Sequence, residues 1–533
     1  MEHIELYDTT LRDGTQGEEV SLSVDDKLRV ARALDEFGID YIEGGWPGSN
    51  PRDEEFFLRA HALHLLHARL AAFGSTRRAK NRVQDDANIN ALLAAETPVV
   101  TIFGKSWLLH VREALQISEQ ENLDIISDSV SYLSGQGREV IYDAEHFFDG
   151  YKDNREYALK TLRAARESGA RTIVMCDTNG GSLPEMIARI VEDVRSALGG
   201  ALGIHTHNDG DLAVANTLAA VHSGAVHVQG TINGYGERCG NANLCSVIPN
   251  LQLKLGYRCV GMQHLARLTS LSKYVADLAN LSQGKHMPFV GPSAFAHKGG
   301  VHVSAVMKNN ATYEHIEPEV VGNRRRVLVS DLSGRSNVTY KAKELGIALE
   351  EKSPVIQSIV DEIKTREHDG YHYEDADGSL ELLIKQKLDT WCEFFELGGF
   401  KVIIHKESTE AASVCEALIK VRVGNEVEHT AAEGNGPVNA LDKALRKALE
   451  KFYPALRKMV LSDYKVRVLD GFDGTGAKVR VLITSRDDDG SWNTVGVSNN
   501  IIEASWKALV DSIYYFLMKQ TAPAELVEHH GGA

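Results

Sequence analysis

The first 258 residues repeat one pattern eight times, a short apolar stretch typical of a β-strand followed by a longer stretch with helical periodicity. In 24–37, for example, Val24, Leu28, Ala31 and Leu34 recur on one helix face. The predicted strands cover residues 3–7, 41–45, 70–74, 99–103, 139–142, 172–176, 202–206 and 226–231. Eight such units in about 250 residues are typical of a (β/α)8 barrel rather than an open doubly wound sheet. The sequence therefore predicts an α/β fold with a TIM barrel over residues 1–285.

Polar side chains follow several of the predicted strands. Active sites of TIM barrels lie where strands end and the loops to the next helices begin. The polar residues at those positions are Arg12 and Asp13 after the first strand, Glu145 after the fifth, Asp177 and Thr178 at the sixth, His205 and His207 at the seventh, and Asn241 after the eighth. Because these strand ends share one mouth of the barrel, we expect the side chains to gather there.

The sharpest of these signals is the motif IHTHND at 204–209. Alternate side chains of a strand face the same way, so His205 and His207 point together. Two imidazoles with an amide and a carboxylate close behind make half of a divalent-metal site. An isolated pair holds a metal poorly, and two polar residues at a strand end are then the simpler interpretation. A metal site therefore requires further ligands from the same mouth.

The strand-helix alternation stops after about residue 285. Pro288, Pro292 and the Gly299-Gly300 pair mark a loop-rich connector, which we place at 286–388 with helical subdomains. Amphipathic helices are predicted from about 340 to 365, and the acidic stretch 368–378 is predicted to be a solvated loop. The connector carries a concentration of functional groups unusual for a linker, namely His297, Lys298, His302, Asn309, Asn310 and Tyr313.

A repeat predicts a separate domain at 389–520, followed by a tail at 521–533. Residues 430–445 align without gaps to 494–509 with six identical residues, and an apolar strand precedes each copy. A duplicated strand-helix unit predicts a pseudo-symmetric α+β domain whose sheet faces pack on helices. The domain lacks a nucleophile-base set and a phosphate loop, which favours binding or assembly. A dimerisation module alone is the simpler alternative.

Composition limits the partners and the compartment. The 533 residues carry a formal net charge of -16, which argues against nucleic acid or an anionic membrane surface as a partner. No apolar run approaches transmembrane length, and the amino-terminal segment MEHIELYDTTLRDG is acidic rather than signal-like. The six cysteines show no C-x-x-C spacing, which is typical of reduced thiols in a cytoplasmic protein.

Three motifs together are similar to those of one enzyme family. They are LYDTTLRDGTQ at 6–16 followed by Lys27, IHTHND at 204–209, and NGYGERCGN at 233–241. They closely resemble the α-isopropylmalate synthase, homocitrate synthase and citramalate synthase family, whose wider group includes hydroxymethylglutaryl-CoA lyase. The second motif continues with Gly210-Asp211, whereas the family usually has its Gly one residue later. That departure concerns the loop and leaves the ligands intact.

The resemblance implies condensation of acetyl-CoA with a 2-oxo acid, followed by hydrolysis of the thioester. It makes Asp13, His205, His207 and Asn241 the ligands of a divalent metal, either Mn²⁺, Mg²⁺ or Zn²⁺. The mixed ligand set does not choose among these metals. Arg12 resembles the family's catalytic arginine, which suits an oxyanion developing on the carbonyl oxygen. A salt bridge at the barrel rim is the alternative for Arg12.

The other roles also follow from the resemblance. Thr178 is expected to bind the carboxylate of the 2-oxo acid. Glu145 and His302 match the family's catalytic Glu and His, a pair suited to removing a proton from the acetyl methyl group. Tyr313 matches a Tyr that contacts substrate or activates the hydrolytic water. Family members commonly have Asp two residues after the His, but this chain has Ser304. A homodimer in which His302 acts in trans is a hypothesis from the resemblance alone.

Within the family, the chain resembles the branch that uses pyruvate. The relevant stretches are EGGWPGSNPRDEEFF at 43–57, FAHKGGVHVSA at 295–305 and RRRVLVSDLSGRSN at 324–337. Trp46 is a candidate for limiting the pocket to a methyl group. The repeated domain is then expected to be regulatory, with isoleucine as its effector. The alternatives are a 2-isopropylmalate synthase acting on 2-oxoisovalerate, and a non-catalytic amino-acid sensor that keeps the barrel as a scaffold. A broken ligand set or a lost Arg would mark a sensor, and the sequence shows neither.

Overall fold

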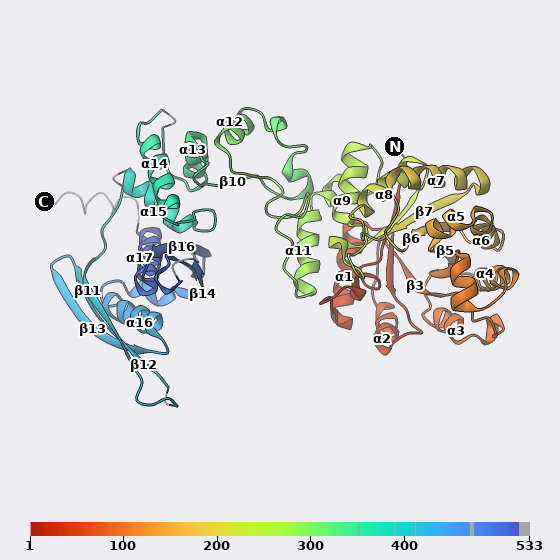
Figure 1. Cartoon of the computed structure of the whole chain (residues 1–533), viewed down its shortest axis with the longest axis horizontal. Helices are drawn as coiled ribbons and strands as arrows, with labels where there is room; N and C mark the ends of the chain where they lie inside the picture. The colour runs from red at the N-terminus through yellow and green to blue at the C-terminus, as the bar shows by residue number, and fades with distance from the viewer. Residues whose placement is uncertain (1, 351, 389, 411, 470–473, 522–533) are drawn as a thin grey trace. The chain divides into compact units, whose positions relative to one another are not determined.

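The chain forms two compact units, each with its own hydrophobic core (Figure 1). The units are Met1–Phe295 with Ile316–Arg325, and Ala296–His315 with Arg326–Ala533. The computed structural model describes residues 2–350, 352–388, 390–410, 412–469 and 474–521. The predicted tail therefore lies outside the described residues, apart from Thr521. Within the described ranges, no helix is both long and apolar enough to cross a bilayer.

The first unit contains a closed barrel of eight parallel strands in sequential order, as the sequence predicts. All eight predicted strands are present, and the fifth continues three residues further than predicted, to Glu145. The strands are β1 (Glu5–Asp8), β2 (Tyr41–Gly45), β3 (Arg69–Ser75), β4 (Val99–Lys105), β5 (Glu139–Glu145), β6 (Thr172–Asp177), β7 (Ala201–Thr206) and β8 (His227–Gly230).

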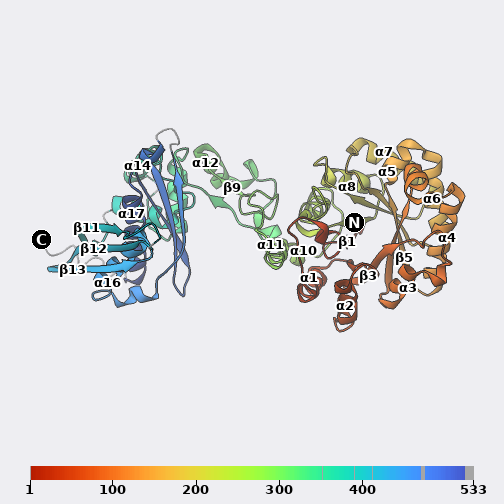
Figure 2. The same ribbon diagram turned by 60° about the horizontal axis from the view of Figure 1, so that its bottom comes forward.

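Helices surround the outside of the strands (Figure 2). The bounds of helix α1 follow from its capping residues. Ser23 and Asp26 form a reciprocal capping box at its start, and Gly38 ends it with φ of 97°. The helices of this unit are α1 (Val24–Phe37), α2 (Pro51–Ala60), α3 (Ala87–Ala94), α4 (Glu119–Gly135), α5 (Phe147–Asp153), α6 (Arg155–Glu167), α7 (Pro184–Leu198), α8 (Ala213–His222), α9 (Leu244–Pro249), α10 (Met262–Leu265) and α11 (Leu268–Leu278).

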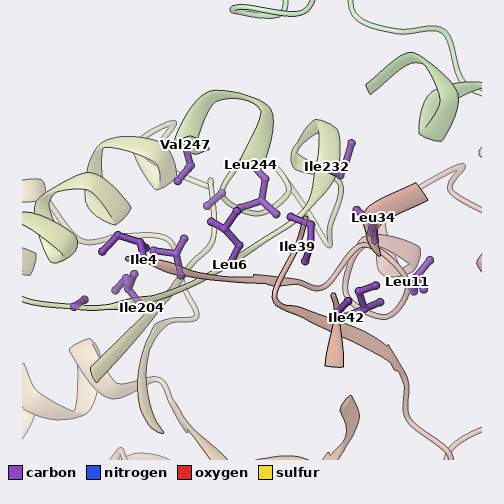
Figure 3. Close-up of a cluster of buried hydrophobic side chains, with 14 of the residues drawn as sticks. Ile4, Leu6, Leu11, Leu34, Ile39, Ile42, Ile204, Ile232, Leu244 and Val247 are labelled. Atoms are coloured by element: carbon purple, nitrogen blue, oxygen red, sulfur yellow. The ribbon is translucent and has the colours of Figure 1, made fainter. Parts of the chain in front are cut away.

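The strand alternation divides the barrel into an apolar outside and a more polar lumen. Leu6, Ile42 and Ile204 point outward into the core between strands and helices (Figure 3). The alternate positions face inward, where a small cluster fills the middle of the barrel. It consists of Tyr7, Tyr41, Ala71, Val99, Ile141, Val174 and Cys176. The lumen is therefore a packed interior rather than a channel.

Ion pairs close the barrel at the amino ends of the strands. Arg171 contacts Glu5 with an Nη2 to Oε1 distance of 2.6 Å, and Arg69 contacts Glu139 at 2.6 Å. Burial raises the pKa of Glu5, but hydrogen bonds with His227 and Arg171 outweigh it and lower that pKa to about 2. This end of the lumen is structural, which leaves the opposite mouth for chemistry.

The connector part of the second unit differs in part from the prediction. The helices predicted from about 340 to 365 are α13 and α14, separated at Gly346, whose φ of 70° breaks the helix. The solvated loop predicted at 368–378 was wrong in part: residues 369–376 form no helix or strand, but Tyr373 and Ala376 are buried in a core. The elements are β9 (Ala296–His297), α12 (Gly300–Lys308), β10 (Arg326–Val327), α13 (Arg335–Glu344), α14 (Val355–His368) and α15 (Asp377–Lys387).

The predicted repeat is confirmed as two copies of a three-stranded antiparallel sheet followed by a helix. The aligned residues Thr430 and Thr494 lie in the third strand of each sheet, and the aligned Pro437 and Ile501 begin the two helices. The elements are β11 (Glu396–His405), β12 (Val414–Val423), β13 (Glu426–Gly434) and α16 (Pro437–Leu449), then β14 (Val460–Val468), β15 (Val479–Arg486), β16 (Ser491–Ser498) and α17 (Ile501–Gln520). The copies make the predicted α+β domain.

Candidate metal centre and catalytic pocket

Three predicted ligands converge at the carboxyl end of the barrel. Asp13 follows β1, His205 lies in β7, and His207 follows it; all three are buried. The Nε2 atom of His205 lies 3.3 Å from Oδ2 of Asp13 and 3.3 Å from Nε2 of His207. Among the described residues this is the one group of three or more acidic, imidazole or thiol side chains placed to share a metal. Atoms with lone pairs at such distances need a proton or a cation between them.

Asn241 lies beside this group but presents its amide in the opposite sense to that expected of a ligand. Its backbone forms a β-bridge with His207, which holds the loop after β8 against the end of β7. Its Nδ2 donates to Oδ2 of Asp13 at 2.7 Å, whereas its buried Oδ1 has no hydrogen-bond partner within the described part of the chain. A half-turn of the amide about its terminal bond exchanges the two atoms and turns Oδ1 toward Asp13. The structure thus brings all four predicted ligands together.

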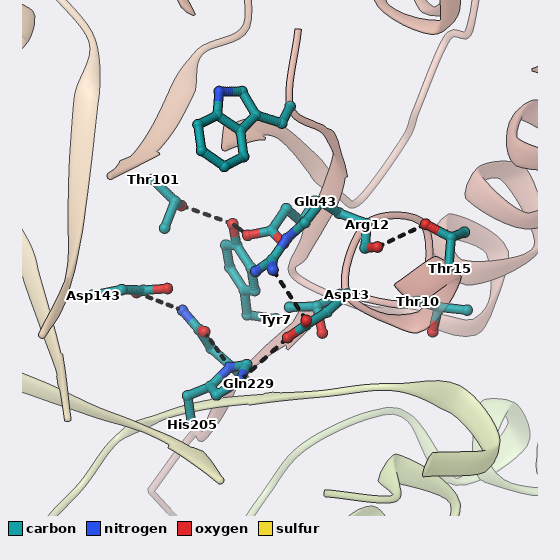
Figure 4. A network of polar contacts seen from close by, with 12 residues as sticks. Tyr7, Thr10, Arg12, Asp13, Thr15, Glu43, Thr101, Asp143, His205 and Gln229 are labelled. Carbon is teal, nitrogen blue, oxygen red and sulfur yellow. Dashed lines mark hydrogen bonds and ion pairs between the residues drawn. The ribbon is translucent and has the colours of Figure 1, made fainter. Parts of the chain in front are cut away.

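A buried relay orients His205 (Figure 4). The Nε2 of Gln229 lies 3.0 Å from Oδ1 of Asp143 and donates to it, and Gln229 Oε1 lies 2.9 Å from Nδ1 of His205. An ionised Asp143 only accepts, so it sets the orientation of the Gln229 amide, and the amide oxygen then requires a proton on Nδ1. Burial raises the pKa of Asp143 to about 7, so this holds at pH values above that. The Nε2 atom of His205 is thereby the one directed toward Asp13 and His207.

The electrostatics of the site suit a cation. Burial raises the pKa of Asp13, but the neighbouring Arg12 and His205 outweigh it and hold that pKa well below its usual range. Burial and the charge of His205 lower the pKa of His207 to about 3, so its imidazole is neutral. Burial lowers the pKa of His205, but Asp13 outweighs this and raises it, so a metal would displace a proton from its Nε2.

The donor set fits a divalent metal ion. One ionised carboxylate, two imidazoles and one amide oxygen would leave coordination positions for a chelating substrate. The unpartnered Oδ1 of Asn241 and the converging nitrogen and oxygen atoms of Asp13, His205 and His207 are the structural observations behind this fit. The set comes from strand β7 and from the segments that follow β1, β7 and β8, which is the arrangement expected of a TIM-barrel active site.

Arg12 is held rigidly next to the ligand group. Its Nε contacts Oε1 of Glu43 at 2.5 Å, and its Nη1 lies 3.0 Å from Oδ1 of Asp13. The guanidinium carbon lies 3.7 Å from the ring centre of Phe73, and Glu43 accepts a further hydrogen bond from Tyr7 at 2.7 Å. Arg12 thus forms ion pairs, as the alternative interpretation expects, and it also lines the pocket beside the ligands, while its catalytic role stays a prediction.

A pocket of about 230 Å³ opens over this group. Its polar wall contains Arg12, Asp13, His205 and His207, and its apolar wall is aromatic. The indole of Trp46 meets the rings of Phe73 and Phe103 edge-on, with ring centres 5.8 and 5.7 Å apart. The indole nitrogen donates to Asn88 at 2.7 Å, which fixes the ring plane. The residues that line the pocket include Arg12, Trp46, Phe73, Phe103, Glu145 and Thr178.

The predicted residues Glu145 and Thr178 also line this pocket. The carboxylate of Glu145, the last residue of β5, contacts the ammonium group of Lys105. Thr178 Oγ1 accepts a hydrogen bond from the backbone N–H of His146 at 2.8 Å, which leaves its own hydroxyl proton to donate. The predicted partner of Glu145 was an imidazole, so Lys105 is an addition that the sequence analysis did not make.

His302 and Tyr313 belong to the second unit, where they are neighbours. Their ring centres lie 4.3 Å apart, and Tyr313 is 49% exposed. The adjacent Glu314 lies 2.9 Å from Nε2 of His297, and this buried pair joins the start of the segment to its end. The structure brings His302 and Tyr313 together as a pair, and their catalytic roles stay predictions.

Comparison with known proteins shows the class of this barrel. Residues 3–275 match the family described as HMGL-like, residues 289–370 match the homocitrate synthase post-HMGL domain, and residues 374–517 match the LeuA allosteric (dimerisation) domain. The chain belongs to the HMGL-like family, in the subgroup that carries both of these additional domains.

The particular relatives are more specific. The chain is 57% identical to (R)-citramalate synthase of Geobacter sulfurreducens over 97% of its length and 98% of that protein. It is 55% identical to (R)-citramalate synthase of Aquifex aeolicus, with the same coverage. A probable 2-isopropylmalate synthase of Methanopyrus kandleri is 34% identical, covering 96% of this chain and 98% of that one. The chain is thus much more similar to these two (R)-citramalate synthases than to that probable 2-isopropylmalate synthase.

Sequence reasoning missed the residues that support the site. Glu43, Asp143 and Gln229 lie inside strands and face the lumen, yet they stand among apolar neighbours that look like any buried strand. Lys105 was missed because the predicted fourth strand stopped at Phe103. A signal was available, because Thr101, Phe103 and Lys105 continue the inward alternation that starts at Val99.

The relay through Gln229 generates a prediction about metal affinity. Gln229→Leu removes the acceptor for Nδ1 of His205, so the variant is expected to bind Mn²⁺ about 10- to 100-fold more weakly, measured by the loss of the free-ion electron paramagnetic resonance signal. Thr101→Val is the matched control, because it deletes another buried hydrogen bond, to Tyr7, without touching His205. Equal Mn²⁺ affinity in the two variants would contradict the relay.

Proposed function

We propose that this chain condenses acetyl-CoA with pyruvate and hydrolyses the thioester, giving (R)-citramalate and CoA. The observation that supports it most directly is Arg12 held between Asp13 and Glu43, beside His205 and His207, in a pocket with a small aromatic wall. The full-length similarity to proteins named (R)-citramalate synthase supports the same reaction. The protein is accordingly an acyltransferase of the condensing type.

The pocket supplies groups for binding the 2-oxo acid. A divalent ion held by Asp13, His205, His207 and Asn241 would supply Lewis-acid polarisation of the substrate carbonyl. Free N–H groups of Arg12 are placed beside that centre to hold negative charge that develops on the keto oxygen. The hydroxyl proton of Thr178 is free to donate to the substrate carboxylate. Positioning and charge stabilisation thus come from groups that are already fixed in the structure.

The aromatic wall supports pyruvate over larger 2-oxo acids. Trp46, Phe73 and Phe103 pack against one another, with Phe73 directly against Arg12, and we propose that they exclude the isopropyl group of 2-oxoisovalerate. Discrimination by one or two methylene groups amounts to about 1 to 3 kcal/mol. A wall of three mutually packed rings is stiff enough to supply that difference. The distant relatives named 2-isopropylmalate synthase are less similar, which agrees with this choice.

The remaining roles complete the proposal. Glu145, paired with His302, accepts a proton from the acetyl methyl group, and Tyr313 contacts substrate or activates the hydrolytic water. We place the enzyme in the cytoplasm as a homodimer in which His302 acts on the partner's barrel. The six free cysteines are in keeping with a reducing compartment. We keep the functional division at residues 285 and 388 as part of this proposal.

The proposal is tested by measuring thiol release from acetyl-CoA with Mn²⁺ or Mg²⁺ and four acids: pyruvate, 2-oxobutanoate, 2-oxoisovalerate and 2-oxoglutarate. Pyruvate is expected to give the highest kcat/KM, and EDTA is expected to abolish release. Arg12→Ala is expected to lower kcat by about 100- to 1000-fold, because it removes a donor at the developing oxyanion. Arg112→Ala, which removes an exposed guanidinium, is the control and should leave kcat unchanged. A preference for 2-oxoisovalerate would overturn the substrate assignment.

The repeated domain supports feedback control by the end-product amino acid isoleucine. Its match to the LeuA allosteric (dimerisation) domain, and the exposed Val466 and Val468 on β14, support association of two copies at this domain. An effector bound there would bias two states of the connector and so the position of His302. The domain is thus proposed to act through assembly and ligand binding rather than through chemistry.

Isoleucine is expected to inhibit the full-length enzyme and to raise the temperature at which it unfolds, because a ligand that binds the native state stabilises it. Leucine and valine at the same concentration serve as matched controls and should act more weakly. The measurements are initial rates and thermal unfolding, with mass from light scattering to give the oligomeric state. Unchanged rates with all three amino acids would rule out the proposed effector class, and a monomer would rule out the dimer.

A further inference from the structure

Lys105 and Glu145 form an ion pair at the mouth of the barrel. They are the last residues of β4 and β5 and face each other in the parallel register of these two strands. The ammonium nitrogen of Lys105 contacts the carboxylate of Glu145, and both side chains are less than a quarter exposed. Glu145 is the one carboxylate that Lys105 contacts among the described residues. The pair is therefore neither deeply buried nor a solvated surface bridge.

The strand alternation directs Lys105 into the lumen. Thr101, four residues earlier on β4, reaches the hydroxyl of Tyr7 inside the barrel at 2.7 Å. Phe103, the next position of the same parity, lines the pocket. Lys105 continues that series by one more step, and its ammonium lies 5.4 Å from the centre of the Phe103 ring. A cation is thus fixed at the edge of the pocket, next to the carboxylate proposed to accept the methyl proton.

Arg12, which lines the pocket, and Lys105, at its edge, differ in what already neutralises them. Arg12 is shared by two carboxylates, Asp13 and Glu43, and lies next to the metal ligands. Among the described residues, Lys105 forms an ion pair with Glu145 alone. If Glu145 becomes neutral by accepting a proton, Lys105 loses its counter-charge, whereas Arg12 keeps both of its own. Proton transfer to Glu145 therefore leaves an unneutralised positive charge at this point of the pocket.

We propose that Lys105 is a catalytic residue that binds the thioester oxygen of acetyl-CoA as it becomes an enolate oxygen. This inference rests on the proposed condensation and on Glu145 as the base. In the step, Glu145 takes a proton from the methyl carbon, and the electron pair of that C–H bond becomes the C=C bond of the enolate. The carbonyl π electrons move to the thioester oxygen. Negative charge thus passes from the Glu145 carboxylate to the thioester oxygen. Lys105 is next to the negative charge both before and after this transfer.

In the next step the negative charge moves from the thioester oxygen to the keto oxygen of pyruvate. The enolate carbon forms a bond to the keto carbon of pyruvate, the thioester C=O bond re-forms, and negative charge appears on the former keto oxygen beside Arg12. Each cation therefore serves one oxygen, Lys105 that of the thioester and Arg12 that of the keto acid. A fixed charge aimed at the oxygen that gains charge is commonly worth about 100- to 1000-fold in rate.

The test compares Lys105→Met, which keeps the length of the side chain but removes its charge, with Lys105→Arg, which keeps the charge. Lys105→Met is expected to lower kcat by about 100- to 1000-fold. The KM for pyruvate and the Kd for Mn²⁺ should stay within about twofold, because neither involves the thioester. Lys105→Arg should recover kcat to within about tenfold of the wild type. Lys160→Met, at an ion-paired lysine on the outer helix α6, is the control and should leave kcat unchanged.

A second measurement separates catalysis from a structural role. With trideuterated acetyl-CoA, Lys105→Met should show an isotope effect on kcat at least as large as that of the wild type, because proton abstraction is the step made slower. A kcat within threefold of the wild type, or loss of the isotope effect, would overturn the role of Lys105. A wild-type enzyme inactive with all four acids would instead overturn the proposed function, and the inference with it.

Discussion

The carboxylate of Asp13 is the interaction on which the active site depends. It is buried, and it is shared by the guanidinium of Arg12 at 3.0 Å, the amide of Asn241 at 2.7 Å and the imidazole of His205 at 3.3 Å. These groups come from the loops after β1 and β8 and from β7 itself. A buried charge is tolerated only when it is well partnered, so this one carboxylate holds three parts of the barrel mouth in register. The same requirement makes the position suitable for a divalent cation.

The barrel separates stability from chemistry along its axis. At the amino ends of the strands, Glu5, Glu139 and two arginines satisfy one another. Tyrosines and small apolar residues fill the middle. The layer above them carries Glu43, Asp143 and Gln229, which fix Arg12 and His205. The groups proposed to touch substrate stand above that layer, at the mouth. A non-catalytic sensor would not need this support, and the intact ligand set disfavours that alternative.

Local periodicity predicted the barrel and placed Asp13, His205 and His207 at one mouth of it, and the family resemblance identified these residues as ligands. Strand alternation fixes which residues share a face, and sequential strands fix which ends meet. The sequence did not identify Gln229 or Asp143, because their role depends on which face of each strand turns into the lumen. The sequence also did not predict the amide orientation of Asn241. This orientation depends on Asp13, which is close in space but distant in the chain. Tyr373 was predicted to be exposed because the residues around it are acidic. Its burial depends on tertiary packing, which the local sequence does not indicate.

The most direct test of this account is a crystal structure of the protein soaked with Mn²⁺, with the ion located by its anomalous scattering. The account predicts one barrel-bound ion at about 2.0 to 2.3 Å from Asp13 and from the Nε2 atoms of His205 and His207. The amide of Asn241 should be turned so that its oxygen faces the ion. An ion bound elsewhere in the barrel would contradict the account. So would Asp13, His205 and His207 that remain hydrogen-bonded to one another, with no ion between them, at saturating Mn²⁺.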